Sequence, residues 1–177
     1  DNFAIVHFHP ETYLKSNNYH HMKKILLALI KNKINIICIY PCNDQGYQGI
    51  IKAIKETKKK YPKCIKVFKI LERDYFIKLL KLSKFLIGNS SSGIIETPFL
   101  NKWSINIGSR QNMRLKSKFT LNSSASEKSI IKKIKFIYNN KSYRDPIYGN
   151  GISYKKNLHT LKKLIKNKKN LKYFYAK

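Results

Sequence analysis

The residues best suited to chemistry gather at one junction in the middle of the chain. Residues 84–100 read KFLIGNSSSGIIETPFL, so an apolar run ends in Gly-Asn, three serines and a glycine before a second apolar pattern begins. Serine and glycine at the start of a helix present main-chain N–H groups and hydroxyls, and the helix dipole adds partial positive charge. Such a junction is suited to bind a phosphate or diphosphate. Plain capping of a helix by serine is the alternative interpretation.

Glu96 follows this junction by one helical turn. A carboxylate facing a phosphate would repel it. A carboxylate turned aside can instead accept two hydrogen bonds from a ribose diol, as acidic residues do in other nucleotide-binding folds. The alternative is that Glu96 only interacts with the helix dipole.

Three basic side chains stand at other places where an apolar run ends. His9 follows the run FAIVHF, and Arg110 and Arg114 follow WSINI. The chain has 4 arginines and 33 lysines, so two arginines in one loop favour contact with an anion. A histidine at the end of a strand can also be an ordinary polar residue whose hydrogen bonds are satisfied within the protein.

The elements that must position these residues alternate along the chain. The apolar runs predict strands at 3–8, 34–40, 65–70, 85–88 and 103–107, and the helical patterns predict helices at 17–32, 47–60, 74–83, 93–100, 126–139 and 152–167. This alternation predicts an α/β fold, a Rossmann-like parallel sheet with helices on both faces. Ligands bind such sheets at the carboxyl ends of the strands, which is where the polar junctions fall.

The bulk composition sets the remaining expectations. The 177 residues are enough for one domain, which we place at 1–168 and follow with a basic tail at 169–177. The chain begins at Asp1 and enters a strand at once, so we expect it to be the later part of a longer protein. No apolar run approaches the ~18 residues that span a membrane, and no leader pattern is present, so we expect a cytoplasmic protein without membrane contact.

The net charge of +28 suggests nucleic-acid binding, but its distribution argues against it. The lysines are spread along the chain, and arginine, which base and phosphate recognition favours, is scarce. We therefore expect no specific nucleic-acid partner. The three cysteines, Cys38, Cys42 and Cys64, have no metal-ligand spacing, and we expect free thiols, no metal and no cofactor.

The segments HPET, YPCNDQG, GNSSSGIIE, INIGSRQNMR and DPIYGNG, in this order and spacing, resemble the UDP-N-acetylglucosamine 2-epimerase family. The similarity is strongest to the hydrolysing branch, which begins sialic acid and related nonulosonic acid pathways, and it covers residues 4–166. The resemblance implies the C-terminal, nucleotide-binding half of a two-domain GT-B-type enzyme.

The resemblance also implies the roles of individual residues. The diphosphate would contact Ser91, Ser92 and Gly93, the ribose Glu96, and the uracil the chain near Leu71 and Glu72. His9 matches the catalytic histidine beside the sugar and diphosphate. Asn89, Arg110 and Arg114 would be further anion or sugar contacts. The implied partners are a UDP-sugar, an N-terminal Rossmann-like domain of the same protein, and further copies of the protein in a homo-oligomer.

The implied reaction eliminates UDP across C1–C2 of the sugar and adds water to give the free 2-epimer. The family's catalytic carboxylates belong to the N-terminal domain, so this chain alone would bind UDP weakly without turnover. The chain departs from the family at Met113, where glycine is usual, at KSKFTL, and at Asn150, where aspartate is common. A nonenzymatic nucleotide-sugar-binding module and a GT-B glycosyltransferase half are the alternatives.

Overall fold

One six-stranded sheet forms the centre of the fold, in the order β3-β2-β1-β4-β5-β6 with every neighbouring pair parallel. The computed structural model describes residues 2–11 and 17–166. The strands are β1 (Phe3–His7), β2 (Asn35–Ile39), β3 (Ile65–Phe68), β4 (Phe85–Gly88), β5 (Trp103–Ile107) and β6 (Thr120–Ser123). The helices are α1 (Asn18–Lys31), α2 (Tyr47–Lys60), α3 (Arg73–Leu82), α4 (Ser92–Phe99), α5 (Glu127–Asn139) and α6 (Ser153–Lys166).

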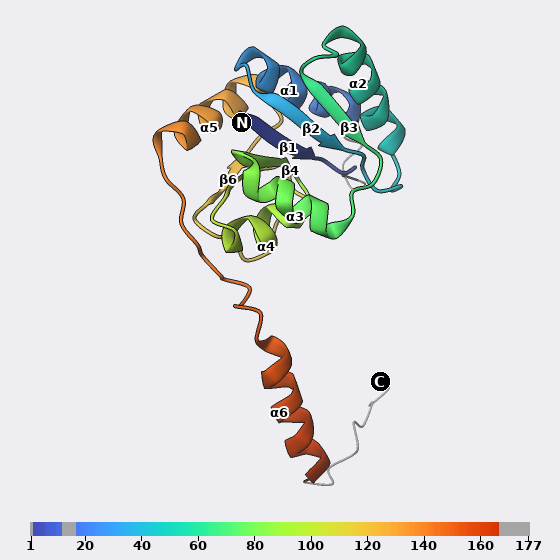
Figure 1. The fold of residues 1–177 in the computed structure, drawn as a ribbon. Coiled ribbons are helices and arrows are strands. Elements are labelled where there is room, and N and C mark those ends of the chain that lie inside the picture. The colour runs from blue at the N-terminus through green and yellow to red at the C-terminus, as the bar shows by residue number, and fades with distance from the viewer. Residues whose placement is uncertain (1, 12–16, 167–177) are drawn as a thin grey trace. The chain divides into compact units, whose positions relative to one another are not determined.

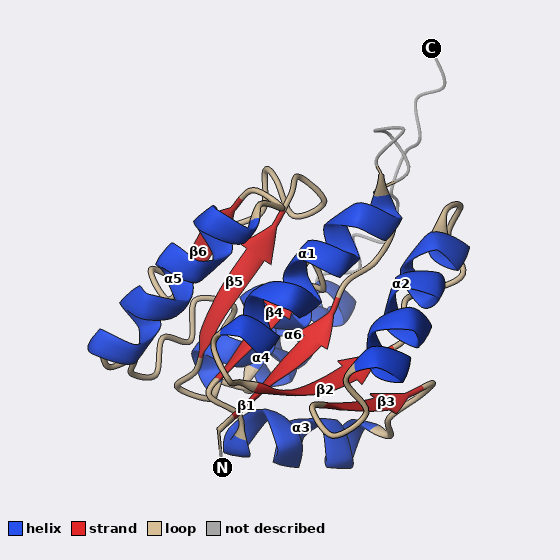
Figure 2. Ribbon diagram, turned by 90° about the horizontal axis from the view of Figure 1, so that it is seen from above, coloured by secondary structure: helices blue, strands red, loops and turns tan. Residues whose placement is uncertain are grey.

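Helices cover both faces of the sheet, as predicted. α1, α2 and α5 lie on one face and α3 and α4 on the other (Figure 1), and the strand arrows run in one general direction (Figure 2). The side chains of β1 alternate between the two faces: Ala4 and Val6 belong to the larger buried cluster and Phe3 and Ile5 to the smaller one. The α/β fold with a parallel sheet is therefore confirmed.

The direction in which the sheet is built reverses between β1 and β4. The chain builds β1, β2 and β3 outward in one direction and then returns to place β4 on the other side of β1. At such a reversal the connections leave the sheet on opposite faces, and the loops at the carboxyl ends of the two strands separate. The residues after β1 and β4 are therefore the ones best placed to meet a ligand.

The sixth strand was not predicted from the sequence. β6 has the sequence TLNS, and its burial pattern is uneven because it forms an edge of the sheet. A short, partly polar edge strand carries neither an apolar run nor a clear alternation. Its pairing with β5, from Ser104–Thr120 to Ile107–Ser123, is what identifies it.

The chain divides into two compact units, Asp1–Ile147 and Tyr148–Lys177. The sheet belongs to the first unit and α6 to the second, whereas the sequence analysis placed residues up to 168 in one domain. The predicted basic tail at 169–177 lies outside the described residues. In the part of the chain that the structure describes, no helix is long and apolar enough to cross a membrane.

Candidate functional site

The pairing of β1 with β4 brings His9, which follows β1, close to the serine junction, which follows β4. His7 is opposite Gly88 in the register of the two strands. Gly88 has φ +144°, and a Cβ atom there would lie 2.0 Å from the carbonyl oxygen of His7. Only glycine allows the two main chains to approach so closely. The glycine that begins the serine junction, Gly88, is therefore required by the close contact between the two strands.

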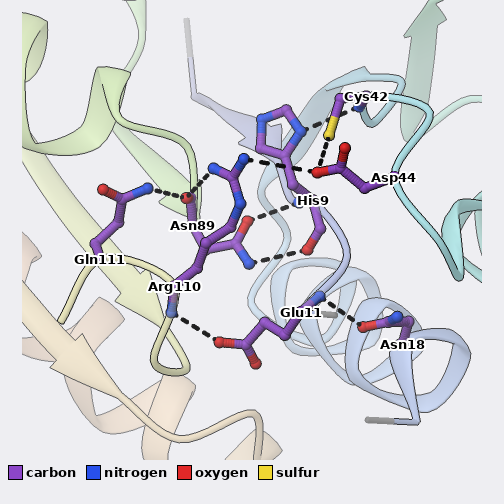
Figure 3. A network of polar contacts seen from close by, with 8 residues as sticks. All are labelled: His9, Glu11, Asn18, Cys42, Asp44, Asn89, Arg110 and Gln111. Atoms are coloured by element: carbon purple, nitrogen blue, oxygen red, sulfur yellow. Dashed lines mark hydrogen bonds and ion pairs between the residues drawn. The ribbon is translucent and has the colours of Figure 1, made fainter. Parts of the chain in front are cut away.

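Asn89 fixes the main chain of His9. Its side-chain oxygen accepts the N–H of His9 at 2.6 Å, and its side-chain nitrogen donates to the carbonyl of His9 at 2.9 Å (Figure 3). Asn89 is fully buried. Asn89 was predicted as a possible anion or sugar contact; the structure shows both polar atoms of its side chain bonded to the residue predicted to be catalytic.

The His9 ring is held by the loop that follows β2. Its Nδ1 accepts a hydrogen bond from the main-chain N–H of Cys42 at 3.1 Å. The Cys42 thiol donates to Asp44 at 3.0 Å (Figure 3). The sequence singled out the segment YPCNDQG only as part of a family pattern. The structure places two of its residues directly beside His9.

Two histidine rings lie together at this point. The rings of His7 and His9 are 4.4 Å apart between centroids, and Nδ1 of His7 is buried without a partner among the described residues. Burial, then the nearby charges of His9 and Arg110, lower the pKa of His7 to about 3. Burial and the Arg110 guanidinium also lower the pKa of His9 to about 4, against an opposing effect of Asp44. Both imidazoles are therefore neutral at pH 7.

The loop after β5 brings Arg110 to the same place. Its Nη1 approaches the carbonyl oxygen of Asn89 at 3.5 Å, and its Nη2 lies 3.9 Å from a carboxylate oxygen of Asp44. Gln111, which is 2% exposed, donates to the same carbonyl of Asn89 at 2.7 Å. Arg114 is one step further away and donates to the side chain of Gln111 at 3.2 Å. The two predicted arginines thus have unequal positions, with Arg110 beside the histidines.

Glu11 is a site residue that the sequence analysis missed. One of its carboxylate oxygens accepts hydrogen bonds from the main-chain N–H groups of Ser109 and Arg110, at 2.5 and 2.8 Å, and from the Ser109 hydroxyl at 3.0 Å. Gly108 has φ +78°, and a Cβ atom there would lie 2.6 Å from both oxygens of this carboxylate. An acidic residue two positions after His9, in a chain with only nine acidic residues, was the available signal in the sequence.

The serine junction forms the start of α4 without conventional capping. Ser91 occupies the N-cap position with φ −59° and ψ −24°, and its hydroxyl makes no capping hydrogen bond. An N-cap residue normally has extended backbone angles, which point its oxygen at the first turn. Instead, the Ser90 hydroxyl oxygen accepts a long hydrogen bond from the main-chain N–H of Ser92, at 3.4 Å. Ser91 and Ser92 are both half-buried. The hydrogen bond from the first turn to the Ser91 hydroxyl, which plain capping requires, is absent.

Gly93 faces the sheet. A Cβ atom at this position would lie 3.2 Å from Leu86 and 3.5 Å from Ser104. Its carbonyl oxygen accepts hydrogen bonds from the side chains of Thr97 and Ser104. The absent side chain therefore lets α4 pack closely on β4 and β5, which is a reason for glycine that the sequence analysis did not consider.

Glu96 has one carboxylate oxygen bound and one unused. Arg73, the first residue of α3, donates to Oε1 at 3.2 Å, while Oε2 is buried with no partner among the described residues. The Glu96 side chain is 17% exposed and that of Arg73 is 72% exposed. Arg73 was not identified from the sequence. A buried carboxylate oxygen without a donor is costly.

The residues predicted near the uracil lie where β3 leads into α3. Leu71 packs against the smaller buried cluster, and Glu72 is the exposed N-cap residue of α3. All three cysteines are free thiols, as predicted. Within residues 2–11 and 17–166, no group of three His, Cys, Asp or Glu side chains is arranged to hold a metal ion.

Comparison with known proteins identifies the family of the chain. Residues 1–162 match the family model described as UDP-N-acetylglucosamine 2-epimerase. The chain is 35% identical over 130 residues to the UDP-N-acetylglucosamine 2-epimerase of Neisseria meningitidis serogroup B, covering 73% of this chain and 34% of that protein. It is 34% identical over 110 residues to the UDP-N,N'-diacetylbacillosamine 2-epimerase (hydrolyzing) of Legionella pneumophila, covering 62% of this chain and 29% of that protein.

The fold has solved counterparts. The Methanocaldococcus jannaschii UDP-GlcNAc 2-epimerase, solved in complex with UDP-GlcNAc and UDP, matches with a TM-score of 0.75 and 16% identity over 92% of this chain and 46% of that one. The chain thus spans about a third of the curated relatives it matches and just under half of the solved structure. By its sequence, the chain belongs to the UDP-N-acetylglucosamine 2-epimerase family.

Proposed function

We propose that this chain is the UDP-binding half of a hydrolysing UDP-sugar 2-epimerase. The substrate is UDP-N-acetylglucosamine or a related UDP-2-acetamido sugar, and the products are UDP and the free 2-epimer. Two observations support the hydrolysing branch: the segment GNSSSGIIE and the Legionella relative whose name carries that activity.

The unused oxygen of Glu96 is the observation that carries the proposal. It is buried one helical turn after Ser91, Ser92 and Gly93, at the carboxyl end of the sheet. A ribose diol can donate to the partly exposed Glu96 carboxylate while its diphosphate contacts the start of α4, where the helix dipole favours negative charge. The uracil then lies near Leu71 and Glu72, at the start of the neighbouring helix.

The chemistry divides between the two halves of the whole protein. A base removes the C2 proton, and the C1–O bond breaks with its electron pair leaving on UDP, so that a C1=C2 double bond forms. Water then adds its hydroxyl to C1 and a proton to the opposite face of C2. In this half, α4, His9 and Arg110 are placed to stabilise the charge on the departing diphosphate. We assign the C2 base to an N-terminal domain of the same protein.

The sugar end of the site differs from the usual family pattern. Met113 occupies a left-handed position with φ +64°, where the family usually has glycine, and its side chain is fully exposed. Together with the segment KSKFTL, this change supports a modified sugar such as a diacetamido-trideoxyhexose. We further propose that the whole protein forms homo-oligomers and acts in the cytoplasm, a compartment that keeps thiols such as Cys42 reduced.

Calorimetry with UDP on the 177-residue chain tests the binding half of this proposal. We expect measurable binding that is lost in a Ser91→Ala/Ser92→Ala variant and retained in Ser124→Ala, which changes an exposed serine outside α4. Absence of UDP binding by the unaltered chain would reject the proposal.

Product analysis of the whole protein tests the reaction. Free 2-epimer and UDP in equal amounts support the hydrolysing type. Formation of an epimerised UDP-sugar would assign the non-hydrolysing type instead, and UDP-sugar binding without any turnover would favour the nonenzymatic module.

A further inference from the structure

The hydrogen bond to the His9 ring determines where that ring carries its proton. The partner of Nδ1 is the main-chain N–H of Cys42, at 3.1 Å. A main-chain N–H can only donate, so Nδ1 must be an acceptor and carries no hydrogen. In the neutral imidazole, the hydrogen is therefore on Nε2.

The main chain of His9, from which the ring extends, is held on both sides by Asn89. Asn89 accepts from its N–H and donates to its carbonyl. Since each partner is a main-chain group of known type, the orientation of the Asn89 amide is also defined. Figure 3 shows the ring extending from this clamp with one nitrogen toward Cys42 and the other directed away from it.

The surroundings oppose a second proton on this ring. A proton on Nδ1 would set two donors, Nδ1–H and the Cys42 N–H, against each other. Burial of the ring and the positive charge of Arg110, from the loop after β5, both disfavour a second proton, while the neighbouring His7 ring from β1, 4.4 Å away, is neutral at pH 7. Among the described residues, Asp44 in the loop after β2 favours protonation of His9, and its carboxylate also contacts Arg110 and the Cys42 thiol. Asn89, which follows β4 and contacts the main chain of His9, is uncharged.

We infer that His9 meets its ligand as a neutral imidazole that donates through Nε2–H, and that the main-chain amide of Cys42 sets this tautomer. His9 then contributes a fixed hydrogen bond to the departing diphosphate and transfers no proton to it. The positive charge at the site comes from Arg110 and the start of α4. This role deepens the proposed function, and it rests on that function only for the identity of the ligand.

The tautomer can be measured without any ligand. We expect nitrogen-15 NMR of the 177-residue chain, labelled at histidine, to show the Nε2–H tautomer of His9 with no protonation between pH 8 and pH 5. The loss of one set of signals in His9→Asn assigns the resonances. An Nδ1–H tautomer, or an imidazolium that forms with a midpoint above pH 6, would overturn the inference.

Two variants at one position test the role of Cys42. Cys42→Ser keeps the main-chain N–H and should leave the tautomer unchanged. Cys42→Pro removes that N–H, and we expect a mixture of tautomers and protonation of His9 at a higher pH. An unchanged His9 spectrum in folded Cys42→Pro contradicts the assignment to this amide; if that variant does not fold, the spectrum of the unaltered chain still decides the tautomer.

Binding of UDP-N-acetylglucosamine gives an independent readout, because its diphosphate has no terminal phosphate group that titrates near pH 6. We expect its affinity to change by less than twofold between pH 8 and pH 5.5, with no proton uptake in calorimetry across buffers of different ionisation enthalpy. Uptake approaching one proton per ligand would contradict a neutral donor. No binding at any pH would reject the proposed function and leave the NMR result standing.

Discussion

The carboxylate of Glu11 holds the main chain of Arg110, while the guanidinium of Arg110 contacts the carbonyl of Asn89 and the carboxylate of Asp44. The oxygen that accepts the Arg110 N–H at 2.8 Å also accepts two hydrogen bonds from Ser109. Two consecutive main-chain N–H groups around one oxygen form an anion-binding nest, here filled by a side chain of the protein itself. Glu11 therefore positions the arginine loop against the end of β1 without neutralising the arginine.

Replacing Glu11 should destabilise the protein and loosen Arg110. Glu11→Ala removes the acceptor of three hydrogen bonds, and we expect the free energy of unfolding to fall by at least about 2 kcal/mol, since hydrogen bonds to charged groups contribute about 1.5–3 kcal/mol. Glu11→Gln retains one oxygen acceptor and should cost about half as much. UDP affinity should fall in both.

Denaturant titration checks this prediction, with Glu127→Ala as the control. Glu127 pairs with Lys31 on the surface, where an ion pair contributes less than about 1 kcal/mol. Equal losses in Glu11→Ala and Glu127→Ala would show that the Glu11 network contributes little.

Met113→Gly should stabilise the chain. Met113 has φ +64°, and its side chain is fully exposed, so the change relieves backbone strain and removes no packing. A left-handed conformation costs a residue with a Cβ atom about 1–2 kcal/mol, and part of this gain is offset by the greater freedom of glycine in the unfolded chain. We expect a net gain of about 0.5–1 kcal/mol in thermal or denaturant unfolding.

Met113→Ala is the matched control for this gain. It removes the side chain beyond Cβ but keeps the Cβ atom, so it should leave stability unchanged. A similar gain in both variants would assign the effect to loss of an exposed apolar side chain.

Stability should fall as the pH is lowered from 7 to 5. The pKa values of His7 and His9 are lowered to about 3 and about 4 in the folded chain, while unfolded histidines take up protons near pH 6.5. The stabilisation that comes from keeping these two histidines neutral is therefore fully present above pH 6.5. It is lost as the pH falls toward their pKa values in the folded chain. We expect the free energy of unfolding to fall by at least about 1 kcal/mol between pH 7 and pH 5.

His7→Phe separates this effect from other titrations. The His7 ring makes an edge contact with Phe76 and has a buried nitrogen with no described partner, so an apolar ring should fit at pH 7 without loss of stability. The dependence of stability on pH between 7 and 5 should be weaker in this variant. An unchanged dependence would show that His7 is not held neutral by the fold.

Glu96 should make the site prefer ribose to deoxyribose. Hydrogen bonds from a 2′-hydroxyl to a carboxylate predict roughly tenfold tighter binding of UDP than of 2′-deoxy-UDP. Glu96→Gln should abolish most of this preference. Arg73→Met should preserve it, because the arginine uses Oε1 and leaves Oε2 for the ligand.

Calorimetry with the two nucleotides measures this preference in all three forms of the chain. Equal affinity for both nucleotides in the unaltered chain would contradict the role of Glu96. Loss of the preference in Arg73→Met would show that the ion pair is needed to orient the carboxylate.

The order of the elements was predictable because each has a periodic pattern of its own. Buried parallel strands such as FAIVH and FLIG read as continuous apolar runs, and the predicted bounds of β4, β5 and α2 agree with the structure. The edge strand β6 could not be predicted because it is stabilised by its pairing with β5. Its four residues, TLNS, carry no periodic pattern of their own.

The residue types of the site were determined by the sequence, but their partners were not. His9, the serine junction, Glu96 and Arg110 could be named because each follows an apolar run at a strand end. Asn89 bonds to a residue 80 positions away, and Glu11 to residues 98 and 99 positions away. These contacts exist because the strand order sets β1 beside β4, and no local pattern encodes which side chain will face which main-chain group. The tertiary structure alone therefore decided that Asn89 clamps His9, that Glu11 holds the arginine loop, and that Arg73 shares Glu96 with the place proposed for the ribose.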